Sequence, residues 1–200
     1  MQYKFSKYTT SDNELKEISF AWFCLSLAFA ILFTGKLTLS SDFIASFIFA
    51  GISVGLSFIF HELAHKIVAQ RYGCIAEFRA FREMLLFTIL LSFFGIIFAA
   101  PGAVIISGYV NRIANGKIAS AGPLTNIFLS GFFMLIYLFY GGGFIAELLK
   151  YCIYINALLA VFNLIPLALF DGAKIFYWDK KIWGIMMFCA GILMIVSGMI

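Results

Sequence analysis

Charged residues are scarce in this sequence, and their scarcity excludes an ordinary soluble domain. Lysine, arginine, aspartate and glutamate make up 12% of the 200 residues, hydrophobic residues make up 63%, and the mean hydropathy is +1.01. An average soluble domain has about 25% charged residues. The fourteen basic residues stand singly or in pairs between apolar runs, so the net charge of +4 does not indicate a nucleic-acid partner. The composition predicts a protein whose partner is the lipid bilayer.

Cysteine, histidine and proline are also rare. The four cysteines lie far apart, without the paired spacing of a zinc site or a disulfide framework, and we expect them to be buried free thiols. A chain of 200 residues has room for about five or six membrane helices, because one crossing needs roughly 20 apolar residues. We therefore expect a single membrane domain over residues 1–200, in which residues 1–17 form a polar N-terminal segment.

Five apolar runs are long enough to cross a bilayer. The first of them has a cleaved signal peptide as its alternative, but its apolar stretch continues beyond Ala28-Phe29-Ala30, so we favour a membrane helix. The second run ends at Gly73, a residue that commonly terminates helices. The predicted membrane helices are 18–35, 43–72, 117–140, 145–167 and 182–200.

A sixth apolar run, residues 84–108, is interpreted from the distribution of charge. If this run does not cross, twelve of the fourteen basic residues lie on one side, and Lys36 and Lys150 lie opposite. Such a bias is typical of the cytoplasmic side of a membrane protein, and a crossing would reduce it to about eight against six. We therefore predict an all-α polytopic membrane protein with about five transmembrane helices plus a re-entrant or in-plane element around residues 84–108. Its turn is expected at Pro101-Gly102.

The sequence H-E-L-A-H at residues 61–65 places both histidines of the chain inside an apolar helix. Residues four apart share one helix face, so His61 and His65 can bind one metal ion. Glu62 is expected beside them, where it can take a proton from a metal-bound water whose pKa the metal lowers to about 7. A carboxylate at this depth costs roughly 2.5 to 3.5 kcal/mol, and zinc catalysis gives a reason for it.

The third ligand is predicted to be Asp171, which follows the apolar run 151–170 at the same end of the membrane as the histidines. Pro166 breaks that helix and allows the chain to turn inward. Three other acids are weaker candidates because they sit in loops beside basic residues: Asp42, Glu147 and Asp179. The expected cofactor is one Zn²⁺ per chain.

Three motifs together resemble the site-2 protease family of intramembrane zinc metalloproteases. They are H-E-L-A-H at 61–65, A-G-P-L-T-N at 121–126 and N-L-I-P-L-A-L-F-D-G at 163–172. The resemblance covers about residues 45–177. It implies that His61, His65 and Asp171 bind zinc and that Glu62 is the general base. The chain departs from better-known members because no PDZ or CBS module is present and the segment 74–116 is longer and more apolar.

The resemblance also implies a substrate class, a single-span membrane protein cut in or near its transmembrane segment. Asn163, Pro166 and Asn126 are the expected substrate-binding residues, and Asn163 is placed near the cleaved carbonyl. A strand-like edge at Pro101–Ile106, or alternatively at Ile165–Phe170, could pair with the unwound substrate.

Two other functions remain open at the level of sequence. A membrane zinc transporter could carry the same histidine spacing, although the chain has no histidine-rich loop and few spans. A non-catalytic zinc-binding scaffold is the other alternative. The presence of Glu62 argues against it, because a scaffold has no need of a general base. The distribution of charge predicts a multi-pass protein of the cell membrane whose N-terminus and active-site end face the cytoplasm.

Overall fold

The computed structural model describes residues 2–5, 8–97, 101–140 and 142–200. Helices make up most of it, and two antiparallel pairs of short strands complete it. In chain order the elements are β1 (Gln2–Phe5), β2 (Tyr8–Ser11), α1 (Asp12–Thr34), α2 (Ser41–Val54), the π-helical turn η1 (Gly55–Ile59), α3 (Phe60–Arg71), β3 (Ile75–Ala80), α4 (Arg82–Ser92), β4 (Gly102–Ser107), α5 (Arg112–Tyr137), α6 (Phe144–Leu164), α7 (Asp171–Trp178) and α8 (Lys180–Ser197).

Five helical stretches are long and apolar enough to cross a membrane, which confirms the predicted all-α polytopic class. Four of them are α1, α5, α6 and α8, and the fifth runs without a break from α2 through η1 into α3. Helices α1 and α5 begin five or six residues earlier than predicted. The reason is capping, because the side chains of Ser11 and Asn111 accept hydrogen bonds from the first free helical amides and so include a polar first turn.

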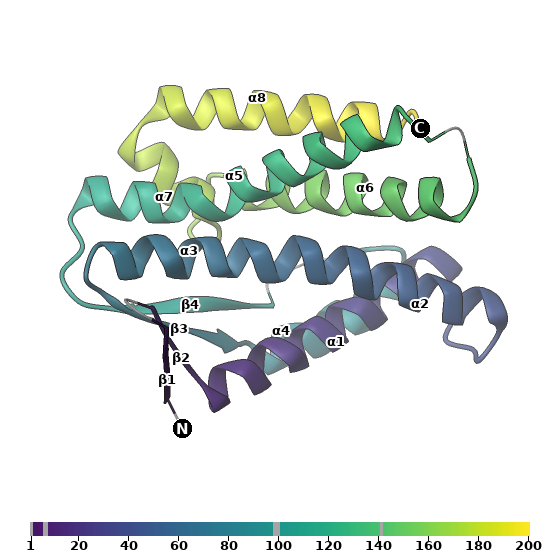
Figure 1. Ribbon diagram of the computed structural model, residues 1–200, viewed down its shortest axis with the longest axis horizontal. Coiled ribbons are helices and arrows are strands. Elements are labelled where there is room, and N and C mark those ends of the chain that lie inside the picture. Colours follow the sequence, from purple (N-terminus) through teal and green to yellow (C-terminus); the bar gives the residue numbers. More distant parts are fainter. Residues whose placement is uncertain (1, 6–7, 98–100, 141) are drawn as a thin grey trace.

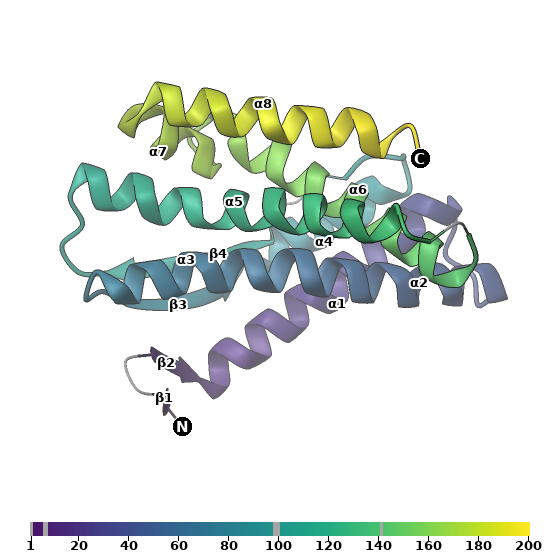
Figure 2. The same cartoon turned by 45° about the horizontal axis from the view of Figure 1, so that its top comes forward.

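Helices α3 and α5 run side by side in the middle of the molecule (Figures 1 and 2). Helices α1 and α4 lie on one side of this pair, and α8 lies on the other. A buried apolar cluster that includes Leu25, Phe58 and Leu159 joins α1, η1 and α6. Large apolar side chains such as Phe128 and Ile195 are exposed on the outer helix faces, as expected where lipid rather than water surrounds the protein.

The apolar run at residues 84–108 enters the molecule and returns. Helix α4 has 11 residues, too few to cross a bilayer. Strands β3 and β4 are antiparallel, with Ile75 opposite Ser107, so the chain comes back to the end of the molecule from which it left. Figure 1 shows the ends of α3 and β4 and the starts of α5 and α8 gathered at this one end. No candidate span falls on the described residues of this run, as predicted for a re-entrant or in-plane element.

The position predicted for the turn of this element is wrong. Pro101 already accepts a backbone hydrogen bond from Phe81, and β4 follows it directly, so the chain reverses before Pro101-Gly102. Residues 98–100 of this connection lie outside the described residues. Of the two alternative strand-like edges, Pro101–Ile106 coincides with β4, whereas Ile165–Phe170 is a loop between α6 and α7.

Two carboxylates at the start of α1 occupy the outer edge of β3. Glu14 is fully buried, forms an ion pair with Lys66 of α3 and accepts a hydrogen bond from the Phe78 amide at 3.0 Å. Glu17 accepts one from the Ala80 amide at 3.1 Å. Along an antiparallel pair of strands, pairs of opposite residues whose backbone groups hydrogen-bond to each other alternate with pairs whose backbone groups point away from the partner strand. Phe78 and Ala80 use their amides on the outer side of β3, so the residues opposite them, Val104 and Gly102, also direct their backbone groups away from β3, toward the free edge of β4.

Replacing Lys66 with methionine is expected to lower the free energy of unfolding by about 3–5 kcal/mol, because the buried Glu14 carboxylate then loses its counter-charge. The double variant Glu14→Gln with Lys66→Met should recover much of this loss, since the glutamine oxygen still accepts from the Phe78 amide. Chemical unfolding in detergent, followed by tryptophan fluorescence, measures both. A single variant as stable as the wild type would contradict the burial of this pair.

Candidate metal centre

Helix α3 presents two imidazoles to one point. His61 and His65 are both buried, and their Nε2 atoms lie 3.0 Å apart. The π-helical turn η1 immediately precedes α3, and such a turn carries one extra residue. It therefore rotates the histidine-bearing face relative to α2. The spacing predicted from the sequence is thus realised on one face of one helix.

Both imidazoles are held by their other ring nitrogen. His65 Nδ1 donates to the Ile118 carbonyl at 2.7 Å, and His61 Nδ1 donates to the amide oxygen of Asn126. Asn126 can only accept here, because its nitrogen donates to the Ser57 carbonyl and to Asn156 Oδ1, both at 3.0 Å. Each Nδ1 therefore carries the proton, and each Nε2 directs a lone pair at the shared point.

Asp171 reaches the same point from α7. Helix α6 ends at Leu164, and Ile165 is extended before Pro166, so the chain turns and α7 begins at Asp171. The Asp171 Oδ2 atom lies 2.9 Å from His65 Nε2 and 3.6 Å from His61 Nε2.

The three groups fit a zinc ion. Two nitrogen lone pairs and a carboxylate oxygen converge, and without a cation between them they would repel one another. Ligands held at 2.0–2.1 Å in a tetrahedron stand roughly 3.3–3.5 Å apart, which is comparable with the 2.9, 3.0 and 3.6 Å observed here. Within the described part of the chain, these are the three side chains with the spacing of a metal site.

Glycines make room for this centre. A Cβ on Gly122 of α5 would lie closer than 3.0 Å to the Nε2 atoms of both His61 and His65, a separation that real Cβ atoms essentially never show. A Cβ on Gly172 would collide in the same way with the Leu164 carbonyl at the end of α6. Gly122 thus lets α5 approach the imidazoles, and Gly172 lets α7 bring Asp171 against them.

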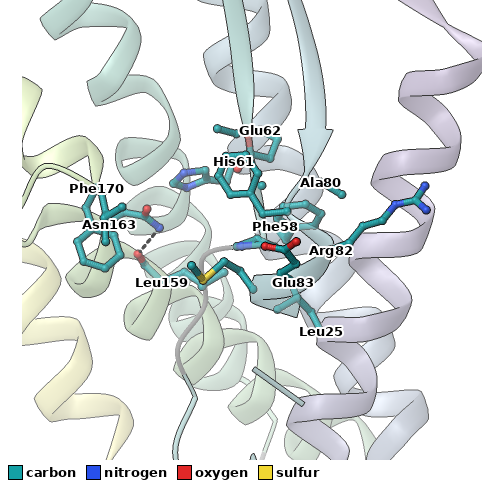
Figure 3. Close-up of a pocket in the computed structure, with 16 residues that line it drawn as sticks. Leu25, Phe58, His61, Glu62, Ala80, Arg82, Glu83, Leu159, Asn163 and Phe170 are labelled. Atoms are coloured by element: carbon teal, nitrogen blue, oxygen red, sulfur yellow. Dashed lines mark hydrogen bonds between the residues drawn. The ribbon is translucent and has the colours of Figure 1, made fainter. Parts of the chain in front are cut away.

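Glu62 lies beside the centre, at the wall between two cavities. One is a cavity of about 540 Å³, shown in Figure 3, and the other is a slot of about 90 Å³ along β4. Both are lined by His61 and Glu62 together with Gly102, Ala103 and Asn163. Substrate entering either cavity therefore meets Glu62 next to the metal ligands, although Glu62 is not one of the three converging groups.

The three residues expected to bind substrate are placed differently. Asn163 lines both cavities and donates from Nδ2 to the Leu159 carbonyl of its own helix. Asn126 is fully buried against His61 and lines neither cavity, and Pro166 lies in the loop after α6 and also lines neither. The weaker ligand candidates lie elsewhere, since Glu147 pairs with Lys150 and Asp179 caps α8.

Replacing Asn126 with alanine is expected to lower the zinc affinity by roughly 10- to 100-fold, because His61 then loses the acceptor that fixes its tautomer and orientation. Competition with a fluorescent chelator measures the affinity. Ser130→Ala is the matched control, since Ser130 is a buried residue of the same helix that bonds the Ile153 carbonyl instead. Equal affinity of the two variants would contradict this role of Asn126.

Comparison with known proteins gives two similar curated sequences. The chain is 46% identical over 142 residues to "Putative zinc metalloprotease MJ0611" of Methanocaldococcus jannaschii. The matched residues make up 70% of the chain and 74% of that protein. It is 32% identical over 143 residues to "Putative zinc metalloprotease YwhC" of Bacillus subtilis, over 62% of the chain and 65% of that protein. No protein-family model matches the chain, and no solved structure matches it at a significant level.

Proposed function

The chain belongs to the family of MJ0611, whose members are named as zinc metalloproteases, and from this premise we propose that it is an intramembrane zinc endopeptidase. The observation that carries the proposal is the convergence of His61, His65 and Asp171 between apolar helices of a protein with five membrane spans. A substrate that reaches this centre lies among the spans rather than in bulk water. We therefore propose that the enzyme cleaves a single-span protein in or near its transmembrane segment, as the resemblance to site-2 proteases implies.

The chemistry is divided between the metal and the protein. A zinc ion held by His61, His65 and Asp171 would polarise the substrate carbonyl and make water acidic enough to attack it at neutral pH. Glu62 accepts the proton of the attacking water and passes it to the leaving amine. Asn163 has a second N–H on its amide nitrogen, which can donate to the developing oxyanion.

Strand β4 offers the substrate a backbone partner. The outer edge of β3 is occupied by Glu14 and Glu17, and the slot beside the metal ligands is lined by Gly102, Val104 and Ile106 of β4. These three residues belong to the pairs that are not hydrogen-bonded across β3 and β4, so their backbone groups point away from β3 and remain available to a third strand. A substrate segment that unwinds from helix to strand can therefore replace its lost helical hydrogen bonds by pairing here.

The proposed setting is the cell membrane, with the metal-binding ends of the helices toward the cytoplasm. The start of α5, α7 and the start of α8 carry basic residues at the same end as the N-terminus, as in Figure 1. This distribution supports the orientation through the positive-inside rule. The bilayer and one membrane-anchored substrate are the proposed partners.

The test is cleavage of a single-span substrate by the purified full chain in detergent. Cleavage should stop when zinc is removed with a chelator and return when zinc is added back, and mass spectrometry should place the cut in or near the membrane segment. Zinc uptake by vesicles containing the protein is measured in parallel. Uptake without proteolysis would favour a transporter, and bound zinc with neither activity would favour a scaffold.

A further inference from the structure

The cavity in Figure 3 is larger and more apolar than hydrolysis at the metal centre requires. Its volume is about 540 Å³, whereas an apolar cavity of about 150 Å³ already holds a benzene molecule. Its walls come from α1, η1, α3, β3, α4, β4, α6 and the loop before α7. Its apolar lining includes Leu25, Phe58, Ala80, Met84, Leu159 and Phe170.

The cavity is continuous with the reaction centre. His61 and Glu62 form part of its wall, and so does Gly102 at the start of β4. A substrate strand pairing with β4 passes this point, and successive side chains of a strand point to opposite faces. One side chain next to the cleaved bond is therefore directed into the cavity when the carbonyl is at the metal.

The charges around the cavity select against acidic side chains. Among the described residues that line it, Glu62 and Glu83 are carboxylates and Arg82 is the basic residue. Arg82 is engaged, since its guanidinium lies 3.3 Å from a carboxylate oxygen of Glu17. A substrate aspartate would lose its hydration in this cavity without gaining an unpaired basic side chain from the described lining residues. An apolar side chain instead buries its surface against Leu25, Phe58 and their neighbours.

We propose that this cavity is a specificity pocket that receives one bulky, uncharged apolar side chain from the substrate residue flanking the cleaved bond. The inference rests on the proposed protease function and adds the chemistry by which the site selects where to cut. The pocket prefers leucine, methionine or phenylalanine to alanine and rejects aspartate. Ala80 and Met84 line the pocket and are not among the three converging groups, so substitutions there change its size without removing a ligand.

The first test varies the substrate. After the cut has been located by mass spectrometry, each of the two flanking residues is changed in turn to alanine, leucine, phenylalanine and aspartate. At one of the two positions, kcat/KM should rise by at least roughly 10- to 200-fold from alanine to leucine or phenylalanine, because a single methylene in an apolar pocket already contributes a preference of that size. Aspartate at that position should give the lowest value.

Variants of the enzyme connect this preference to the cavity. Ala80→Leu narrows the pocket and should reduce the preference for phenylalanine over alanine substrates, whereas Met84→Ala widens it and should favour tryptophan over leucine. Leu86→Ala is the matched control, because Leu86 is exposed on the same helix as Met84 and does not line the cavity. Zinc content is measured for each variant, and if Ala80→Leu does not retain zinc, Met84→Ala decides the question.

A binding experiment is independent of turnover. A substrate carrying photoreactive benzoylphenylalanine at the preferred position is irradiated with the Glu62→Gln variant. The crosslinks should map to residues 81–84 or to Phe58. A preference unchanged by Ala80→Leu and Met84→Ala, a flat substrate series, or crosslinks confined to other helices would overturn the pocket while leaving Glu62-dependent proteolysis standing. Absence of any Glu62-dependent cleavage would overturn the protease function and this inference with it.

Discussion

Replacing Glu62 with glutamine is expected to reduce kcat by roughly 100- to 10,000-fold, the contribution that a positioned general base typically makes. Glutamine has almost the same shape as glutamate but cannot accept the proton of the attacking water. Zinc should stay bound, because Glu62 lies beside the metal ligands and is not one of the three converging groups. Cleavage rate and zinc content of the same purified sample measure the two effects together.

The matched control is Glu147→Gln, which makes the same chemical change in α6 at an acid that pairs with Lys150. This variant should keep both zinc and activity. If Glu62→Gln cleaves as fast as the wild type, the general base has been assigned to the wrong residue. If it loses zinc as well as activity, Glu62 acts as a ligand and the division of roles between Glu62 and Asp171 is incorrect.

Replacing Gly122 with alanine is expected to abolish high-affinity zinc binding. The added methyl group would lie within 3.0 Å of the Nε2 atoms of His61 and His65, so α5 or the imidazoles must move. The imidazoles cannot move freely, because Asn126 and the Ile118 carbonyl hold them from the other side. A displacement of about 1 Å can cost on the order of 100-fold in activity, so cleavage should fall by at least roughly that factor together with the loss of zinc.

Gly131→Ala separates this effect from the general effect of alanine in a helix. Gly131 lies in the same helix, and a Cβ placed on it meets nothing within 4 Å. Alanine there should leave zinc binding unchanged and stabilise the helix by about 0.5–1 kcal/mol. Isothermal titration with zinc compares the two variants. Unaltered zinc affinity in Gly122→Ala would contradict the close approach of α5 to the metal centre.

The arrangement of the membrane spans could be predicted from the sequence because apolar length and charge bias are local properties. The re-entrant element was predictable for the same reason, since crossing by residues 84–108 would have spread the basic residues over both sides. The strand pairing within it was less accessible. The outer edge of β3 is bonded by the carboxylates of Glu14 and Glu17, which come from a segment that the sequence indicates only as a polar N-terminal stretch.

The site could be predicted only as far as its ligand chemistry has a recognisable spacing. His61 and His65 were identified from their separation, and Asp171 from its position after an apolar run, and the structure brings these three together. Gly122 and the Ile118 carbonyl carry no such signal, because a glycine in an apolar helix usually indicates helix packing and a carbonyl has no residue type. Asn126 was predicted to bind substrate, whereas in the structure it contacts His61, and this contact depends on how α5 packs against α3.

The most direct measurement of the central claim is the zinc content of purified Asp171→Ala beside His65→Ala, after dialysis against a mild chelator. The wild-type protein should retain about one zinc per chain, and both variants should lose it to a similar extent, because each removes one of three ligands. Asp42→Ala, a change at an exposed acid at the start of α2, should keep its zinc. Zinc retained at the wild-type level by Asp171→Ala would contradict a centre formed by His61, His65 and Asp171.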